Sequence, residues 1–410
     1  MSILTSKSEQ PYQRRTLTWL DRLQLLPWWG QCAALWLATL LVLTAVGLIA
    51  VQILDLREGY DPIIGVPPNS VPGIWARWDS PYYIHLARDG YAAVPYAMGY
   101  FPLYPLLMRG LSNLTGLSLA FSGMLISQLS YLAAILFFYK LARLIRDDHA
   151  YAMRCVLYLV LFPSSFFFFA VYAEPLSLAF SILAVWLTLG TPPRYHWSGL
   201  ALGIASAARP VGWLLNLILL AEFGLRRKFK WAPLFSLAVG LMLSVLGVVA
   251  FVFYLYSITG TFMAIPKAQS QWLRHWELPW VTLEKSIFIA LTGNGVENDW
   301  FLYVINWSDL LCTLLVLALT VVAFVWSLKQ RFKWSLTIYL IITLIFLLAQ
   351  QGLEEVPLWG MTRWVAAIFP LYLILGDISR RKIVQGAIAL VSGCFLILFM
   401  AWWTSGRWIG

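Results

Sequence analysis

The chain has 410 residues, of which 60% are hydrophobic and 12% are charged, and its formal net charge is +10. Soluble domains carry about 25% charged and about 45–50% apolar residues, so this composition excludes a soluble globular enzyme, a disordered chain and a secreted disulfide scaffold. An excess of Lys and Arg in a membrane protein reflects topology and does not by itself indicate nucleic-acid binding. The composition predicts an all-α polytopic membrane protein.

The apolar runs predict the membrane spans, because a spanning helix needs about 20 apolar residues. The first run, 32–54, follows a polar start, and residues 1–31 are expected to form a cytoplasmic N-terminus. That start is too long for a cleaved signal peptide and no small-residue cleavage site follows it, so we expect an uncleaved anchor. The later runs bring the total to about eleven spans, at 118–141, 155–171, 174–190, 197–209, 210–223, 231–257, 302–328, 335–350, 364–378 and 383–403.

Charge indicates the orientation, because loops on the cytoplasmic side collect Lys and Arg. With the N-terminus inside, the cytoplasmic segments hold 19 of the 29 basic residues and 6 of the 19 acidic ones. Residues 55–117 and 257–301 then form two long outer loops, rich in Trp, Tyr and Pro, that are expected to lie on the membrane. Neither an internal repeat nor a low-complexity linker is visible, so residues 1–410 are interpreted as one domain.

The first outer loop contains a predicted amphipathic helix. Ser80 followed by Pro81 is typical of a helix start, with Ser80 as the cap, and Gly90 is a plausible stop. This short helix is expected to lie in the membrane interface, with Asp79 just before its first turn. Asp79 is either a functional carboxylate or only a helix cap, since aspartate favours the N-terminal dipole end. Farther along, Pro102 and Pro105 predict a bent, surface-lying piece instead of a spanning helix.

An ordered set of short motifs resembles the PIG-V family, which comprises GPI mannosyltransferase 2 and its bacterial relatives, multi-pass glycosyltransferases of the GT-C fold. The motifs follow one another along most of the chain: Arg77-Trp78-Asp79, His85-Leu86-Ala87-Arg88-Asp89-Gly90-Tyr91, Phe101-Pro102-Leu103-Tyr104-Pro105, Phe162-Pro163-Ser164-Ser165, Tyr172-Ala173-Glu174-Pro175, Ala208-Arg209-Pro210, Thr259-Gly260, Ala268-Gln269, Trp272, Arg363-Trp364 and Phe369-Pro370-Leu371. Each motif is weak alone, whereas the ordered set is specific. The resemblance implies a GT-C-like bundle.

The resemblance also implies an activity. Enzymes of this fold take a sugar from a polyprenyl phosphate, such as dolichyl or undecaprenyl phosphate, and transfer it to a glycolipid or glycan acceptor on the non-cytoplasmic side. Asp79 occupies the position of the base expected in the first loop. One base is sufficient because the acceptor hydroxyl must lose a proton, whereas a phosphate leaving group needs no general acid. Direct displacement then predicts inversion at the anomeric carbon, with mannose as the expected sugar and the lipid-linked donor in place of a cofactor.

Cations are expected near the lipid phosphate, where negative charge grows in the transition state. Arg209 is the first candidate, because an ionisable residue inside an apolar stretch is costly and therefore suggests function. The alternative is a structural arginine paired with Glu174. Arg363 is the second candidate, and its alternative is an interfacial anchor. The second outer loop adds three further candidates, each of which is alternatively a solvated loop charge: Lys267, Arg274 and His275.

Trp78, His85 and Glu174 are candidates for contact with the acceptor or the sugar. Trp78 adjoins Asp79, and Glu174 is expected at the outer mouth between two short spans. His85 is alternatively an ordinary interfacial residue. No metal is expected, because Asp79 has no acidic neighbour and no cluster of His, Cys, Asp and Glu has metal-ligand spacing. The cysteines look like buried small hydrophobes; they are Cys32, Cys155, Cys312 and Cys394.

Three other interpretations remain open from the residues. A transporter or lipid flippase would show paired hydrophobic halves, which are not visible, although the short spans near Pro163 and Arg209 would suit one. The chain is alternatively a transferase of the same fold that uses a different sugar. It is also alternatively a noncatalytic subunit that stabilises a membrane-protein partner. Its compact loops favour a bacterial plasma membrane over the endoplasmic reticulum.

Overall fold

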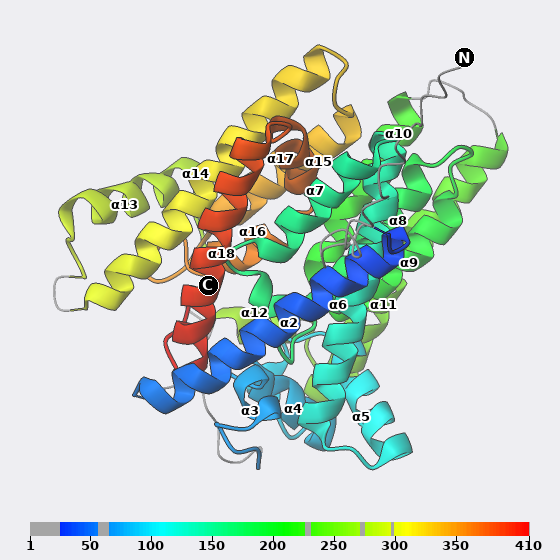
Figure 1. The fold of residues 1–410 in the computed structure, drawn as a ribbon. Coiled ribbons are helices and arrows are strands. Elements are labelled where there is room, and N and C mark those ends of the chain that lie inside the picture. Colours follow the sequence, from blue (N-terminus) through cyan, green and yellow to red (C-terminus); the bar gives the residue numbers. More distant parts are fainter. Residues whose placement is uncertain (1–24, 56–64, 226–230, 271–274, 297–298, 410) are drawn as a thin grey trace, which may run out of the picture.

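The structure is a computed structural model that describes residues 25–55, 65–225, 231–270, 275–296 and 299–409, and it is almost entirely helical (Figure 1). Within these residues five helices are long and apolar enough to span a membrane, which identifies an integral membrane protein. They are α2 (Trp28–Ile53), α6 (Leu119–Ile145), α11 (Trp231–Thr259), α14 (Trp300–Leu328) and α18 (Lys382–Thr404).

Shorter helices fill the space between the long ones. They are α7 (His149–Leu161), α8 (Glu174–Leu189), α9 (Tyr195–Ala208), α10 (Asn216–Leu225), α15 (Trp334–Leu348), α16 (Met361–Ala366) and α17 (Pro370–Ile378). Residues of α8 are mostly buried, whereas the long helices leave apolar side chains exposed over much of their length. This pattern fits a bundle whose outer helices face lipid and whose inner helices are packed in protein.

Three predicted spans are not continuous helices in the structure. Counting apolar residues does not reveal where a proline interrupts a helix. The run 155–171 ends as a helix at Leu161, since Phe162 takes an extended backbone before Pro163. A 3₁₀ segment, η3 (Ser165–Phe168), follows. The run 210–223 begins with another 3₁₀ segment, η4 (Pro210–Leu215), before α10. The run 364–378 is divided by Pro370 into α16 and α17.

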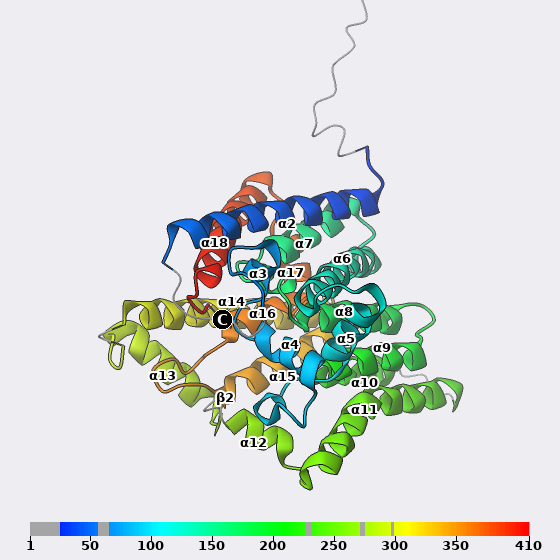
Figure 2. The same cartoon turned by 90° about the horizontal axis from the view of Figure 1, so that it is seen from below.

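The elements of the first predicted outer loop gather at one end of the bundle (bottom of Figure 1). They are α3 (Val71–Trp75), α4 (Ser80–Asp89), the 3₁₀ segment η2 (Pro95–Ala97) and α5 (Leu103–Thr115). The bend expected around Pro102 and Pro105 is absent from Leu103 onward, where a regular helix, α5, begins, because Pro102 lies at its N-cap and Pro105 in its first turn, where proline is tolerated. Figure 2 shows this end face on, with α4 beside α5.

The second predicted outer loop is also structured. It contains α12 (Ala264–Ser270), β1 (His275–Trp276) and α13 (Pro279–Thr292). The two-residue strand β1 pairs antiparallel with β2 (Gln350–Gln351), so that His275 lies opposite Gln351. This pairing ties the second loop to the end of α15.

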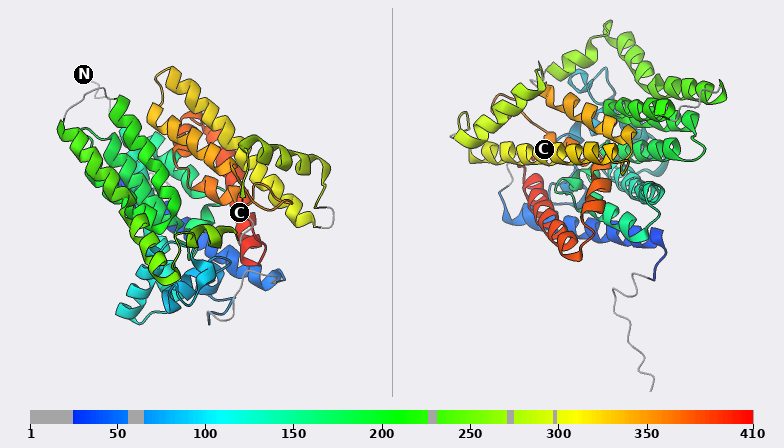
Figure 3. Two further views of the ribbon diagram at one scale, coloured as in Figure 1. Left: turned by 180° about the vertical axis from the view of Figure 1, so that it is seen from behind. Right: turned by 90° about the horizontal axis from the view of Figure 1, so that it is seen from above.

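Helices α9 and α11 approach each other closely along their length, and Figure 3 shows them side by side. A Cβ atom added at Gly199 would lie 2.0 Å from the carbonyl oxygen of Gly240, and one added at Gly203 would lie 2.4 Å from that of Leu243. Only glycine permits such backbone contact. Because α9 ends at Ala208, this contact fixes the position at which Arg209 leaves the helix.

The opposite end of the bundle carries basic side chains. Arg146, which follows α6, pairs with Asp377 at the end of α17, and Arg380 contacts the same carboxylate. Arg154 on α7 donates to the carbonyl of Gly376 at 3.0 Å. These residues lie at the far end of α6 from α5, which contacts its beginning through Tyr104.

Candidate active site

Asp79 lies at the N-cap of α4, but its side chain does not cap the helix. The expectation that Ser80 would be the cap is wrong, because Ser80 is the first helical residue, and the alternative that Asp79 is only a cap is not supported. The backbone N–H of Asp79 donates to the Tyr172 hydroxyl at 3.1 Å, and that hydroxyl donates to the carbonyl of Arg77 at 3.3 Å. Tyr172 therefore fixes the backbone on both sides of Trp78.

Trp78 itself has a left-handed backbone, with a φ angle of 57°. An L-residue pays about 1–2 kcal/mol for this conformation, so the surroundings must enforce it. Its indole N–H donates to the carbonyl of Trp403 at 3.3 Å, and its ring packs edge-on against that of Trp408. Strain of this kind concentrates at functional positions, and here it immediately precedes the carboxylate.

Arg363 joins Asp79 to a second, deeply buried carboxylate. Its Nη1 donates to Oδ2 of Asp79 at 2.5 Å, and its Nε donates to Oε1 of Glu174 at 2.5 Å. Its guanidinium carbon also lies 4.5 Å from the ring centre of Tyr172, at cation–π distance. Oδ1 of Asp79 accepts no hydrogen bond from any residue that the structure describes. One oxygen of Asp79 is thus fixed and the other is left available.

Helix α16, which carries Arg363, is anchored on both sides. The backbone N–H of Thr362 donates to Oδ1 of Asp309 on α14 at 2.7 Å, and the Ser164 hydroxyl donates to the carbonyl of Thr362 at 2.7 Å. Both contacts are buried. A buried, hydrogen-bonded anchor restricts where the arginine can move.

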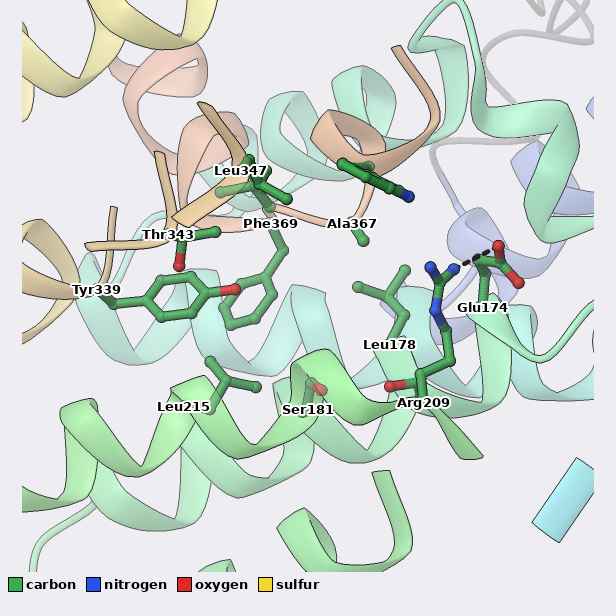
Figure 4. Close-up of a pocket in the computed structure, with 14 residues that line it drawn as sticks. Glu174, Leu178, Ser181, Arg209, Leu215, Tyr339, Thr343, Leu347, Ala367 and Phe369 are labelled. Carbon is green, nitrogen blue, oxygen red and sulfur yellow. Dashed lines mark ion pairs between the residues drawn. The ribbon is translucent and has the colours of Figure 1, made fainter. Parts of the chain in front are cut away.

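Glu174 is shared by two arginines. Its Oε1 contacts Arg209 as well as Arg363, and its side chain is only 1% exposed. Figure 4 shows the Arg209 guanidinium turned toward Glu174. From the sequence, this ion pair with Glu174 was the alternative to a phosphate-binding role for Arg209. Removing these three charges from water is costly, and the attraction between the carboxylate and two guanidinium groups offsets part of that cost.

A large cavity of about 930 Å³ lies beside this cluster, and Asp79, Arg209 and Arg363 all line it. Ligand sites have volumes of about 300–1,000 Å³, so the space suffices for a sugar and a phosphate group. Its wall also contains many aromatic and aliphatic side chains, among them Trp78, Tyr83, Tyr100, Trp213, Ile265, Trp276, Leu302, Phe346, Leu347, Trp359 and Trp408.

Two tyrosines of this wall stay neutral. Burial raises the pKa of Tyr83, and burial also raises the pKa of Tyr100 well above its usual value. Both therefore keep their hydroxyl protons and can serve as hydrogen-bond donors, but not as bases. Among the described residues, the carboxylates that line this cavity belong to Asp79 and Asp299. The Asp299 side chain caps α14, because its Oδ1 accepts from the backbone N–H of Phe301 at 2.9 Å.

A second, small cavity of about 50 Å³ also has Arg209 in its wall (Figure 4). Apart from the ion pair its wall is mostly apolar, with Leu178, Leu215 and Phe369, and the hydroxyls of Ser181 and Tyr339. This volume admits only a few water molecules. The large cavity is therefore the space in which a substrate fits.

A family model described as mannosyltransferase (PIG-V) matches residues 69–280, which is more than half of the chain. The chain belongs to the mannosyltransferase (PIG-V) family. The matched part of this PIG-V family protein includes Asp79, Glu174 and Arg209, whereas Arg363 lies beyond it. No curated protein sequence matches the chain.

Solved structures show the fold. The PIG-V family chain superposes on ArnT from Cupriavidus metallidurans with a TM-score of 0.51 in the apo state, at 16% identity, covering 88% of this chain and 62% of ArnT. The structure of ArnT bound to undecaprenyl phosphate gives a TM-score of 0.50 at the same identity and coverage. The oligosaccharyltransferase of Archaeoglobus fulgidus is 14% identical, with a TM-score of 0.45 over 92% of this chain and 55% of that enzyme. The similarity to the two ArnT structures shows that the chain has the GT-C fold, and the chain spans less than two thirds of the length of these proteins.

The other predicted site residues fall into four groups. Trp78 and His275 line the large cavity. His85 and Lys267 do not, because the His85 ring is 2.7 Å from Nη2 of Arg88 at the other side of α4 and Lys267 is exposed on α12. Glu174 lies behind the two arginines and lines only the small cavity. Arg274 lies outside the described residues.

Sequence reasoning missed the segment after the last span. Gly406, Arg407 and Trp408 line the large cavity although no motif marks them. The signal that was present is an arginine flanked by glycine and tryptophan in an otherwise apolar C-terminal region. Among the described residues no group of three or more His, Cys, Asp and Glu side chains is arranged to hold a metal ion.

Proposed function

We propose that this chain is an inverting glycosyltransferase that moves mannose from a polyprenyl-phosphate donor to a lipid-linked or glycan acceptor, with Asp79 as the base. The observation that carries this proposal is the carboxylate of Asp79 on the wall of a cavity of about 930 Å³, with Oδ2 held by Arg363 at 2.5 Å and Oδ1 without a partner among the described residues. A general base needs this combination of fixed orientation and an available lone pair.

The reaction consists of one displacement at the anomeric carbon. The acceptor oxygen attacks that carbon, the bond to the phosphate oxygen breaks, and the phosphate leaves with the electron pair. The proton of the acceptor hydroxyl passes to Asp79. Phosphate is a stable anion, so the site needs no second carboxylate as acid, in contrast to glycoside hydrolases that protonate their leaving group. A single displacement inverts the anomeric configuration.

Arg363 and Arg209 support the departure of the phosphate. Both line the large cavity, and both are fixed by the buried carboxylate of Glu174. Fixed cations beside a site where negative charge develops lower the barrier because they need no reorganisation during the step. Glu174 is thus a positioning residue in this proposal, and His275 and Trp78 are wall residues beside the donor or acceptor.

The donor class follows from the wall and from the relatives. Apolar and aromatic side chains such as Trp213, Ile305 and Phe346 suit an isoprenoid chain. ArnT, which shares the fold, has been solved with undecaprenyl phosphate. The family description suggests mannose as the sugar. The proposal requires no metal and no cofactor beyond this lipid-linked donor.

The proposed active face is the outer one. Asp79 lies near the α5 end of α6, whereas Arg146, Arg154 and Arg380 lie at the other end. Basic residues mark the cytoplasmic side, so Asp79 faces outward with the N-terminus inside. The compact loops favour a bacterial plasma membrane, so the proposed acceptor is a lipid-linked or glycan acceptor of that membrane.

The test uses radiolabelled polyprenyl-phosphate mannose and membranes from cells that express the wild-type chain, Asp79→Asn or Asp89→Asn. Asp89 is the matched control, because it lies on the same helix and pairs with Arg88 away from the cavity. Loss of a general base lowers the transfer rate about 10²–10⁴-fold, so Asp79→Asn should abolish measurable transfer and Asp89→Asn should not. Arg209→Ala should weaken donor binding.

Equal transfer by Asp79→Asn at equal protein level would contradict the proposed base. Movement of label across sealed vesicles without formation of a glycosidic bond would contradict the transferase itself and would favour a transporter.

A further inference from the structure

The segment that follows α18 turns back onto the large cavity. Helix α18 ends at Thr404, and Gly406 then takes a φ angle of 81°, which only glycine adopts easily. The backbone N–H of Arg407 donates to the carbonyl of Trp402 at 2.9 Å, which closes the turn. As a result, Gly406, Arg407 and Trp408 lie in the cavity wall.

Trp408 holds this segment against the residues around Asp79. Its ring is stacked on Trp359, with centroids 6.5 Å apart and an interplanar angle of 17°, and meets Trp78 edge-on at 5.2 Å. The guanidinium carbon of Arg363 lies 5.8 Å from the same ring. Aromatic pairs of this geometry add stability beyond simple burial. The position of Arg407 is therefore coupled to the position of the proposed base.

Arg407 differs from the other two arginines of the wall. Arg209 and Arg363 are paired with carboxylates. Arg407 uses only Nη1, which donates to the Ser405 hydroxyl at 2.8 Å and to the carbonyl of Asp55 at 3.3 Å. Its Nε and Nη2 have no hydrogen-bond partner, and the residue has no ion pair, in the part of the chain that the structure describes. A partly buried cation without a carboxylate attracts an anionic ligand.

The unused atoms also have a defined shape. Nε and Nη2 form one edge of the guanidinium fork, and such an edge binds two oxygens of a phosphate with two parallel hydrogen bonds. Since the opposite edge is already anchored through Nη1, the fork is oriented before a ligand binds. Preorganised donors increase affinity because less freedom is lost on binding.

We propose that Arg407 binds a phosphate ester of a lipid substrate through Nε and Nη2, which makes the segment 405–408 part of the substrate site. This inference deepens the proposed function and rests on it for the role of the lipid. The phosphate belongs either to the polyprenyl donor or to a phospholipid-type acceptor, because both present the same oxygens to the fork.

The test measures binding to the purified full chain in nanodiscs of neutral lipid, without sugar transfer. The probes are undecaprenyl phosphate, undecaprenol, which lacks the phosphate, and phosphatidylinositol. The variants are Arg407→Gln, Arg407→Lys and, as control, Arg331→Gln, whose side chain is exposed in the turn after α14. A charged hydrogen-bonded pair is lost in Arg407→Gln, so its affinity for the phosphate lipid should fall about tenfold or more, with Arg407→Lys in between and Arg331→Gln unchanged.

Loss of affinity confined to undecaprenyl phosphate would place the donor phosphate at Arg407, and loss confined to phosphatidylinositol would place an acceptor phosphate there. Undecaprenol should bind all variants equally. Unchanged affinity of Arg407→Gln for both phosphate lipids would overturn the inference, and so would a loss that extends equally to undecaprenol. If phosphate binding depends on Arg407 but no variant or wild-type protein transfers sugar, the proposed function fails and the phosphate site stands.

Discussion

Nη1 of Arg363 donates a 2.5 Å hydrogen bond to Oδ2 of Asp79, although 284 residues separate them in the sequence. Asp79 lies within the part of the chain that matches the family model and Arg363 lies beyond it. The carboxylate is therefore oriented by a residue from the other half of the chain. Because the same guanidinium also holds Glu174, the geometry of the cluster depends on α4, α8 and α16 together.

Replacing Arg363 should reduce transfer even though it is not the proposed base. Arg363→Gln leaves Oδ2 of Asp79 without its fixed donor, and small displacements of a reacting group cost about 10²-fold in rate. Arg363→Lys keeps the charge but loses the fork, so its rate should lie in between. Initial rates of sugar transfer, normalised to folded protein, provide the measurement. A wild-type rate in Arg363→Gln would show that Asp79 needs no such orientation.

Glu174 and Arg209 should show strong energetic coupling in a double-mutant cycle. Glu174→Gln removes a buried partner and should destabilise the protein by about 3–5 kcal/mol. The double variant Glu174→Gln/Arg209→Met should lose less unfolding free energy than the two single variants lose together. The difference, which is the coupling energy, should be about 1–3 kcal/mol. Unfolding in mixed micelles measures both quantities.

The matched control is the Arg143–Asp147 pair, in which Asp147 is 87% exposed. Its coupling should be much weaker than that of the buried pair, because solvent and salt screen exposed charges. Equal coupling in the two cycles would indicate that the Glu174 cluster is as solvated as a surface pair.

Glycine should be better tolerated than alanine at Trp78. Both substitutions remove the indole contacts, but only alanine keeps the cost of a left-handed backbone, about 1–2 kcal/mol. Trp78→Gly should therefore unfold at a higher temperature than Trp78→Ala. At Leu317, which is 39% exposed within α14, the order should be reversed, because glycine weakens a helix by about 1 kcal/mol. The same order at both positions would argue against strain at Trp78.

Asp148 should stabilise α7 only while it is ionised. Its side chain accepts from the backbone N–H of Tyr151 at 3.2 Å, and this hydrogen bond lowers the pKa of Asp148 below its usual value. The stabilisation is thus complete above the unfolded pKa of about 3.9 and disappears as the pH falls through the lower folded value. Asp148→Ala should cost about 1 kcal/mol near neutral pH.

Thermal unfolding of the wild type and of Asp148→Ala at neutral and at acidic pH checks this expectation, and the difference between them should shrink in acid. Asp148→Asn is the control, because an amide caps a helix at either pH. A difference between wild type and Asp148→Ala that does not change with pH would contradict the ionised cap.

Local signals in the sequence were sufficient for much of the fold. Pro81 and Gly90 predicted α4 almost to the residue, and the long apolar runs predicted α2, α6, α11, α14 and α18. The short inner spans were less predictable. Hydropathy gives the length of an apolar run, whereas Pro163 and Pro370 decide where the backbone stops being helical.

Individual residues of the site could be predicted from the sequence, but the contacts between them could not. Asp79 was a candidate through its place in the family-like first loop, and Arg209 and Arg363 were candidates through charges in or beside apolar runs, but the pairing of Asp79 with Arg363 depends on tertiary packing that no spacing encodes. Arg407 was missed because it follows the last span in a stretch without a motif. His85 and Lys267 were candidates by charge and loop position, and neither property determines whether a side chain points to a cavity.

The close contact between α9 and α11 determines the position of Arg209, so residues without charge, outside the cavity wall, also affect the site. Since a Cβ at Gly203 would overlap the carbonyl of Leu243, a single methyl group there must wedge the two helices apart and move Arg209, six residues farther along the chain. A naturally occurring alanine at this glycine would look conservative in any comparison of residue types, yet it should behave as a loss-of-function allele.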